Sequence, residues 1–165
     1  MPQKQVPDEV VDPWPDTLRA AGLRVTAPRV AVLRWLAEHP HTTAEQVSVG
    51  VRGVLGSVST QAVYDVLSAC ATVELVRRIE PAGHPARFET RTGDNHHHRV
   101  CRRCGRTEDV DCAVGAAPCL TPSDEAGFTV DEAEVVFWGL CPDCLTAEGS
   151  AVSTQGPIVK EEERA

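Results

Sequence analysis

Apolar residues recur at every third or fourth position through three segments in the first half of the chain, which is the spacing of an amphipathic helix. The first segment opens at Thr26 and ends before Pro40. The second opens with Thr42-Thr43-Ala44-Glu45, a predicted capping box, and ends at Gly56, and the third opens with Ser59-Thr60. The residues predicted to face inward are Val30, Val32, Leu33, Leu36, Ala37, Val47, Val51, Leu55, Ala62, Val63, Val66, Leu67 and Cys70.

Two shorter segments after these helices alternate between apolar and polar residues, as strands do. They are Val76–Ile79 and Ala86–Glu89, and the loop Pro81–Pro85 joins them. Helices followed by an arginine-rich hairpin predict a winged helix, in which the helix opened by Ser59-Thr60 would read DNA. A generic small α+β core is the alternative.

The pattern changes after Gly93. Short strands are predicted at 99–101, 107–111 and 134–138, and a helix at 118–126. Asp16 is predicted to cap a short first helix that Gly22 ends. We therefore predict an α+β chain: a flexible arm (1–15), a winged-helix DNA-binding domain (16–93), a small α/β domain (94–147) and a disordered acidic tail (148–165).

Charge is distributed unevenly along this acidic chain of 165 residues and net charge −8. Residues 17–92 hold nine arginines and six acidic residues, whereas residues 93–165 hold six basic and fourteen acidic residues. A basic first half is compatible with DNA binding, because salt screens the acidic remainder beyond roughly 8 Å. The sequence has no signal-peptide pattern and no apolar run of about 20 residues, so a cytoplasmic protein without membrane contact is expected.

The seven cysteines point to metal or redox chemistry, because disulfides are rare in a reducing compartment. Four of them form two Cys-x-x-Cys pairs, Cys101–Cys104 and Cys141–Cys144. Two such pairs predict a tetrahedral structural zinc site, and a redox dithiol pair is the alternative. Cys70 is expected on a helix core face, while Cys112 and Cys119 are either buried thiols or a redox pair.

Several motifs resemble the ferric uptake regulator family of bacterial metalloregulators. The resemblance covers roughly residues 17–146, and its nearest likeness is to the actinobacterial FurA/CatR branch, whose members repress catalase or catalase-peroxidase genes and respond to peroxide. The family motifs are Ala21–Arg29, His41–Glu45, Ala62–Leu67, Arg87–Glu89 and His96–Gly105, and those of the branch are Asp94–His98, Asp109–Gly115 and Trp138–Cys141.

The resemblance implies a homodimer with winged-helix heads, a C-terminal dimerisation domain and a regulatory metal at the hinge. Nitrogen and oxygen ligands suit Fe(II) or Mn(II), with zinc as a competitor. His96 and His98 are two residues apart and would face the same side of an extended segment. Glu108 stays an alternative to its neighbour Asp109. The implied ligands are His41, Glu89, His96, His98 and Asp109.

Three other histidines are not assigned to this site. His97 would face the opposite side and is predicted to be solvent-facing or part of a weak site, because the positions of its expected partners hold Asn95, Ala116 and Ala133. His39 and His84 are expected at the surface.

DNA contacts are implied for the predicted reading helix and for the loop before the second helix. In relatives the tyrosine packs on thymine methyl groups, and a basic residue at the position of Arg24 enters the minor groove. Asp65 departs from the arginine common in iron-sensing relatives, which changes the expected operator. The implied contact residues are Arg24, Ser59, Thr60, Gln61 and Tyr64.

The function expected from these features is that of a non-enzymatic repressor that senses peroxide through bound Fe(II), with oxidation of His41 or His96, and that controls catalase genes and its own gene. A repressor that senses iron, zinc or nickel availability is the alternative within the family. A Cys-x-x-Cys thiol redox protein is less favoured, because no thioredoxin-like βαβ pattern surrounds either pair.

Overall fold

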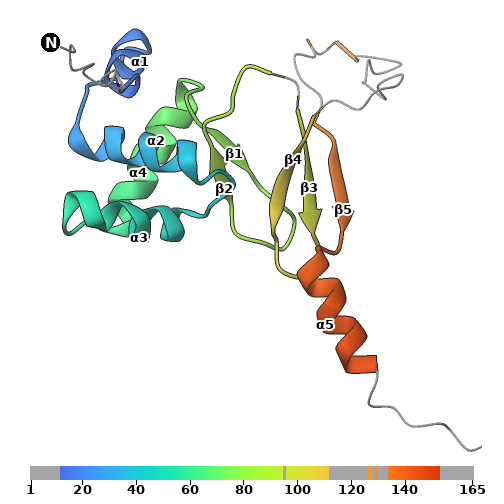
Figure 1. Cartoon of the computed structure of the whole chain (residues 1–165). Coiled ribbons are helices and arrows are strands. Elements are labelled where there is room, and N and C mark those ends of the chain that lie inside the picture. Colours follow the sequence, from blue (N-terminus) through green and yellow to red (C-terminus); the bar gives the residue numbers. More distant parts are fainter. Residues whose placement is uncertain (1–11, 95, 112–125, 128, 130–133, 153–165) are drawn as a thin grey trace, which may run out of the picture. The chain divides into compact units, whose positions relative to one another are not determined.

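The structure is a computed structural model that describes residues 12–94, 96–111, 126, 127, 129 and 134–152. The chain divides into two compact units, Met1–Asp94 and Asn95–Ala165. Figure 1 shows helices with one hairpin in the first unit and a small sheet with one helix in the second.

The N-terminal unit contains four helices and a two-stranded hairpin (Figure 1). The helices are α1 (Trp14–Ala20), α2 (Ala27–Glu38), α3 (Ala44–Leu55) and α4 (Thr60–Thr72). Strands β1 (Arg77–Ile79) and β2 (Arg87–Glu89) pair antiparallel, with Arg78 opposite Phe88. This is the predicted order of helices followed by a hairpin.

Side-chain caps fix where the longer helices begin. Thr26 accepts a hydrogen bond from the backbone N–H of Arg29, and Ser59 accepts one from that of Ala62. The capping box of α3 uses Thr43 and Gln46, so the box predicted from Thr42 lies one residue too early. The prediction that Asp16 caps α1 is also wrong, because α1 starts after Pro13 and Asp16 lies in its first turn.

The core of the N-terminal unit gathers apolar side chains from all four helices and the hairpin. Burying each Leu or Val removes apolar surface from water and contributes about 1.5–3 kcal/mol. Most residues predicted to face inward are buried or half-buried, but Ala37 is exposed. The fully buried apolar side chains include Leu18, Val32, Leu33, Leu36, Val47, Val63, Leu67 and Cys70.

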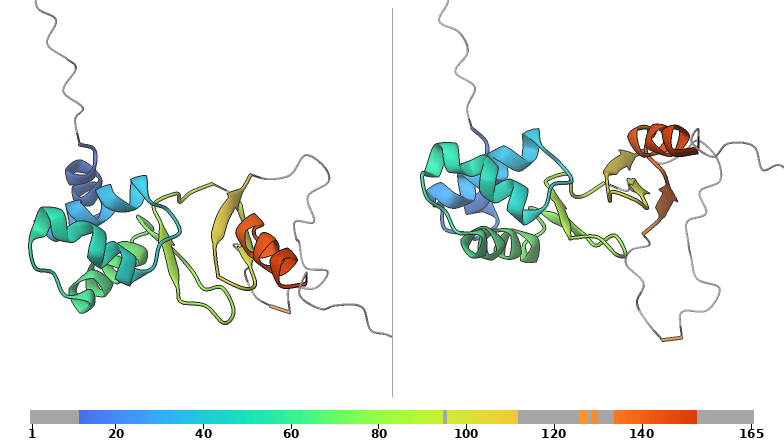
Figure 2. Two further views of the ribbon diagram at one scale, coloured as in Figure 1. Left: turned by 60° about the horizontal axis from the view of Figure 1, so that its bottom comes forward. Right: turned by 90° about the horizontal axis from the view of Figure 1, so that it is seen from below.

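The C-terminal unit contains a three-stranded sheet, seen from two further sides in Figure 2. Its central strand β3 (His97–Cys101) pairs antiparallel with β4 (Thr107–Val110) and parallel with β5 (Val136–Gly139). Strand β3 begins two residues earlier than predicted.

Helix α5 (Pro142–Val152) follows β5 and was not predicted. It includes residues 148–152, which were assigned to the disordered tail. Pro142 suits the first turn of a helix because its fixed φ is already helical. The helix predicted at 118–126 lies outside the described residues except for Ala126, which is in a turn.

A glycine on α3 makes room for a tryptophan of α2. A Cβ atom at Gly50 would lie 2.0 Å from atoms of the Trp35 indole, whereas a Cβ atom at Gly53 would meet nothing within 4 Å. The indole therefore occupies the space beside Gly50. Both glycines lie in the same helix, so they share the same backbone preference for alanine.

We predict opposite effects of alanine at these two positions. Gly50→Ala should lower the free energy of unfolding by about 1–3 kcal/mol, because overpacking outweighs the gain in helix propensity. Gly53→Ala should raise it by about 0.5–1 kcal/mol. Urea unfolding of the full chain followed by far-UV circular dichroism measures both. Equal stabilisation by the two substitutions would contradict the packing of Trp35 against Gly50.

Candidate metal centres and nucleic-acid interface

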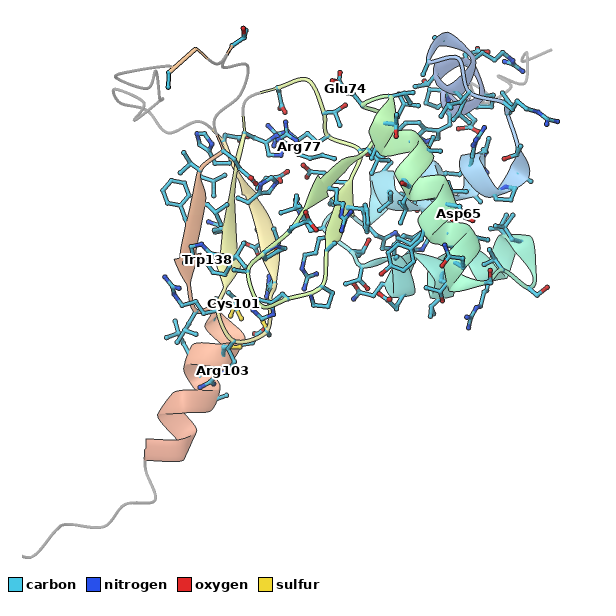
Figure 3. All side chains as sticks on the ribbon, turned by 180° about the vertical axis from the view of Figure 1, so that it is seen from behind. Asp65, Glu74, Arg77, Cys101, Arg103 and Trp138 are labelled. Carbon is cyan, nitrogen blue, oxygen red and sulfur yellow. The ribbon has the colours of Figure 1, made fainter. Side chains whose placement is uncertain are left out.

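The four paired cysteines come together in the C-terminal unit, near the start of α5 (Figure 3). Their Sγ atoms all lie within 4.8 Å of one another, and Cys104 Sγ is 3.7 Å from Cys141 Sγ. Sulfurs bound tetrahedrally to zinc at 2.3 Å would be separated by about 3.8 Å. A disulfide would need about 2.05 Å, and all four thiols are free. The cluster, Cys101, Cys104, Cys141 and Cys144, therefore fits a zinc ion.

Strand pairing brings the two Cys-x-x-Cys turns together. Cys101 is in register with Gly139 of the parallel strand β5, two residues before Cys141. The first turn closes through a hydrogen bond from Gly105 N–H to the Cys101 carbonyl (2.9 Å), with Gly105 at φ 69°. The Arg103 guanidinium then donates to the Cys144 carbonyl at 2.9 Å, which joins the first turn to the second.

The thiols of this cluster differ in acidity. Backbone N–H groups of Cys141 and Cys104 lower the pKa of Cys101 to about 6. Desolvation, followed by hydrogen bonds from neighbouring cysteines, raises the pKa of Cys144 to about 12. Four thiolates this close repel one another, so they need a divalent cation to ionise together.

His41 and Glu89 form the first group of candidate nitrogen and oxygen ligands, inside the N-terminal unit. His41 Nε2 lies 2.9 Å from Glu89 Oε2, and both side chains are buried. His41 has φ 57°, a left-handed conformation that histidine adopts more readily than most residues. Arg87 of β2 donates a hydrogen bond to the His41 carbonyl at 2.7 Å. Because Glu89 is on the same strand as Arg87, this bond keeps the backbone of His41 close to Glu89.

His96, His98 and Asp109 form the second group of candidate ligands, inside the C-terminal unit. The Nε2 atoms of His96 and His98 lie 3.6 and 3.7 Å from Asp109 Oδ1. Neighbouring ligands of one ion with bonds of about 2.1 Å are about 3.0–3.4 Å apart, so each group has spacings close to those of a metal site.

The sheet register separates Asp109 from Glu108. Asp109 is opposite His98 and shares its face, whereas Glu108 is opposite Arg99 on the other face. Glu108 contacts Arg99 at 2.8 Å and Arg106 at 2.7 Å, and the hydrogen bond from Arg99 is the main cause of its lowered pKa. The geometry thus places Asp109, and not Glu108, beside the two histidines.

The expectation that His97 faces solvent is wrong. Its side chain is buried on the opposite face of β3 from His98, with its ring centre 6.3 Å from that of Phe137. His39 is exposed and stacks on Trp35, and His84 is half-exposed. Cys70 is buried in the helical core, as expected, and burial raises its pKa. Cys112 and Cys119 lie outside the described residues.

Helix α4 presents an exposed polar face. Gln61 and Tyr64 are exposed and one turn apart, Thr60 is half-buried, and the hydroxyl of Ser59 is engaged as the helix cap. Arg24 is exposed in the loop before α2.

Two acidic residues contact the polar side chains of this surface: Asp65, which the sequence analysis noted only as a departure from relatives, and Glu45, which it did not connect with DNA contacts. The Tyr64 hydroxyl donates to Glu45 Oε1 of α3 at 3.2 Å, and Gln61 Nε2 donates to Asp65 Oδ1 at 2.9 Å. Burial and the charge of Glu45 raise the pKa of Tyr64. The spacing of four residues could have indicated the Gln61–Asp65 pair. Nothing in the sequence pairs Tyr64 with Glu45, because the two lie on different helices.

A sequence model of the Ferric uptake regulator family matches residues 20–137. The chain belongs to the ferric uptake regulator family. It is 58% identical over 137 residues to the transcriptional regulator FurA of Mycobacterium tuberculosis, covering 83% of this chain and 93% of that protein. It is 26% identical to the peroxide-responsive repressor PerR of Staphylococcus aureus, covering 78% of this chain and 86% of that one.

Solved structures show the same fold. The ferric uptake regulator of Pseudomonas aeruginosa with manganese matches with a TM-score of 0.58 and 29% identity, over 78% of this chain and 98% of that one. The Campylobacter jejuni peroxide stress regulator matches with a TM-score of 0.57 at 20% identity, over 78% and 94% of the two chains. The protein is thus a metal-dependent transcriptional regulator of the actinobacterial FurA type. Within the described residues, no helix is long and apolar enough to cross a membrane.

We predict that one zinc ion co-purifies with each chain and that Cys144→Ser removes it. A structural zinc site contributes about 10–16 kcal/mol of binding free energy at neutral pH, so its loss should unfold the C-terminal unit and prevent dimerisation. Elemental analysis, thermal unfolding and size-exclusion chromatography measure the three effects. Cys70→Ser is the matched control and should keep its zinc. A Cys144→Ser dimer with normal melting temperature and no zinc would show that the cluster is not structural.

Proposed function

We propose that this protein is a homodimeric repressor whose affinity for a DNA operator depends on one bound divalent ion and is lost when peroxide reacts there. The main support is that each compact unit contains its own preformed group of ligands. His41 lies against Glu89 in the N-terminal unit, and His96 and His98 lie around Asp109 in the C-terminal unit. Binding both groups to the same ion would fix the angle between the DNA-reading unit and the dimerisation unit.

The donor atoms favour an ion different from the one in the cysteine cluster. Two carboxylates and three imidazoles suit Fe(II) or Mn(II), although zinc competes for such a site. Four thiolates suit zinc, which we propose as the structural metal. The convergence of all four sulfurs also favours zinc over a thiol redox function, which needs only two cysteines.

Peroxide sensing would rest on the histidines of the regulatory site. His41, Glu89, His96, His98 and Asp109 would hold the Fe(II), which would supply an electron donor for the reduction of hydrogen peroxide beside these side chains. Overall, one oxygen atom of the peroxide would be transferred to an imidazole carbon of His41 or His96, the other would leave as water, and the oxidised ring would be a poorer nitrogen donor. The identity to FurA and the match to PerR support this function, and the FurA/CatR resemblance suggests catalase genes and the protein's own gene as targets.

DNA recognition is proposed for the exposed face of α4. Tyr64 would place its ring against thymine methyl groups, and Ser59, Thr60 and Gln61 would contact the operator at the start of the helix. Arg24 would enter the minor groove. Two heads related by a twofold axis would bind two half-sites.

We predict that Mn(II) raises DNA affinity about 5- to 150-fold, the range that a coupling of about 1–3 kcal/mol produces. Glu89→Ala and His98→Ala should each abolish this increase, because each removes a ligand from a different group. His39→Ala removes an exposed histidine outside both groups and should behave as wild type. Fluorescence anisotropy on a duplex enriched from a random-sequence library measures the effect. A normal response in both ligand variants would contradict the proposed site.

We predict further that low peroxide inactivates the Fe(II)-loaded protein and spares the Mn(II)-loaded protein. Mass spectrometry should then find one added oxygen atom on His41 or His96. A disulfide reductant should fail to restore DNA binding. Restoration by the reductant with unmodified histidines would mean a thiol sensor, with Cys112 and Cys119 as the first candidates. An Fe(II) form that resists peroxide would favour a sensor of metal availability.

A further inference from the structure

The amide of Gln61 is held in one orientation by a carboxylate on the next turn of α4. Gln61 Nε2 donates to Asp65 Oδ1 at 2.9 Å, and both side chains are exposed. An ionised carboxylate can only accept hydrogen bonds, so the amino end of the amide, and not its carbonyl end, must face Asp65. The orientation therefore follows from hydrogen-bond chemistry as well as from the observed geometry. Figure 3 shows Asp65 midway along α4.

This orientation leaves the two groups that a glutamine needs to recognise adenine. In the major groove, glutamine accepts from adenine N6 through its carbonyl oxygen and donates to N7 through one amino hydrogen. The bond to Asp65 uses the other amino hydrogen. We infer that Asp65 is a positioning residue that sets Gln61 to read an adenine of the operator. The inference rests on the proposed DNA-binding function and specifies one base of its target.

Tyr64 lies on the same face of α4 and is held in a similar way. Its hydroxyl already donates to Glu45. The tyrosine therefore offers mainly its ring to DNA, while Gln61 offers paired donor and acceptor groups. Each acidic residue accepts a hydrogen bond from one contact residue, Asp65 from Gln61 and Glu45 from Tyr64.

The charge of Asp65 gives the inference a distinctive consequence. A carboxylate on a DNA-facing helix opposes the attraction between the protein and the phosphates. If Asp65 served only the stability of α4, removing its charge would change the overall affinity for DNA without changing which base is selected. If Asp65 orients Gln61, its neutralisation should strengthen binding to random DNA and weaken selection for adenine at the same time.

Selection from a random duplex library with the full-length, Mn(II)-loaded protein tests this. Wild type should enrich an adenine at one position of each half-site, and Gln61→Ala should reduce that preference by about 5- to 150-fold. Asp65→Asn should lose much of the preference, because an asparagine can either donate or accept and so no longer fixes the amide of Gln61. It should also bind random duplex more tightly, because the substitution removes a negative charge. Asp65→Glu should retain the preference.

Glu38→Gln is the matched control, since it removes one exposed negative charge from the same unit outside α4. It should leave base selection unchanged. Unchanged adenine selection in Asp65→Asn, or in Gln61→Ala, would overturn the inference without affecting the proposed function. If Asp65→Asn instead lost selection for a cytosine at a neighbouring position and kept adenine selection, Asp65 would read cytosine directly and the inference would be overturned. Failure of wild type to enrich any sequence would overturn the proposed function together with this inference.

Discussion

The parallel pairing of β3 with β5 is the constraint on which the chemistry of the C-terminal unit depends. It sets Cys101 beside Gly139 and so brings the second Cys-x-x-Cys turn to the first. The same central strand pairs His98 with Asp109 in the antiparallel direction. A slip of one residue would move each of these side chains to the other face of the sheet. One strand of five residues therefore serves the cysteine cluster at one end and the histidine group at the other. If zinc holds the two turns together, it also secures the register of β3 with β5.

Several arginines in and just after the N-terminal hairpin form hydrogen bonds or ion pairs within their own unit. Arg87 donates to the His41 carbonyl, Arg78 pairs with Glu80, and Arg91 pairs with Asp94. From the sequence, the arginine-rich hairpin favoured a winged helix, and the basic first half of the chain was compatible with DNA binding. In the structure much of this positive charge is engaged within the same unit, and Arg87 supports the turn that carries a proposed metal ligand. On the proposed function, the hairpin would contribute to metal binding through the backbone of His41 as well as through Glu89.

Local sequence rules predicted the helices, the hairpin and the cysteine cluster because each depends on short-range spacing. They failed where two neighbouring residues could fill the same role, and where the pairing of strands distant in the sequence determines which face a side chain occupies. Thr42 with Glu45 and Thr43 with Gln46 both fit the pattern of a capping box. Thr43 caps the helix, whereas the Thr42 hydroxyl donates to the His39 carbonyl and Glu45 accepts from Tyr64. The distinction between Asp109 and Glu108, and the burial of His97, depend on the strand register. Helix α5 was not predicted, because its first turn contains a Cys-x-x-Cys pair that was interpreted only as a metal-binding motif.

The acidic character of the protein is consistent with regulation. A strongly basic DNA-binding unit would bind DNA in both the metal-free and the metal-loaded state, because phosphate contacts carry most nonspecific affinity. An ion that changes affinity by a factor of about 5 to 150 switches occupancy only if the dissociation constant of the metal-free protein for its operator lies above the working protein concentration. The ion pairs of Arg78 and Arg91 and the exposed carboxylate of Asp65 would all lower that starting affinity. On the proposed function, the negative charge on α4 therefore contributes twice: it keeps the metal-free protein off DNA, and it orients the amide that selects the operator.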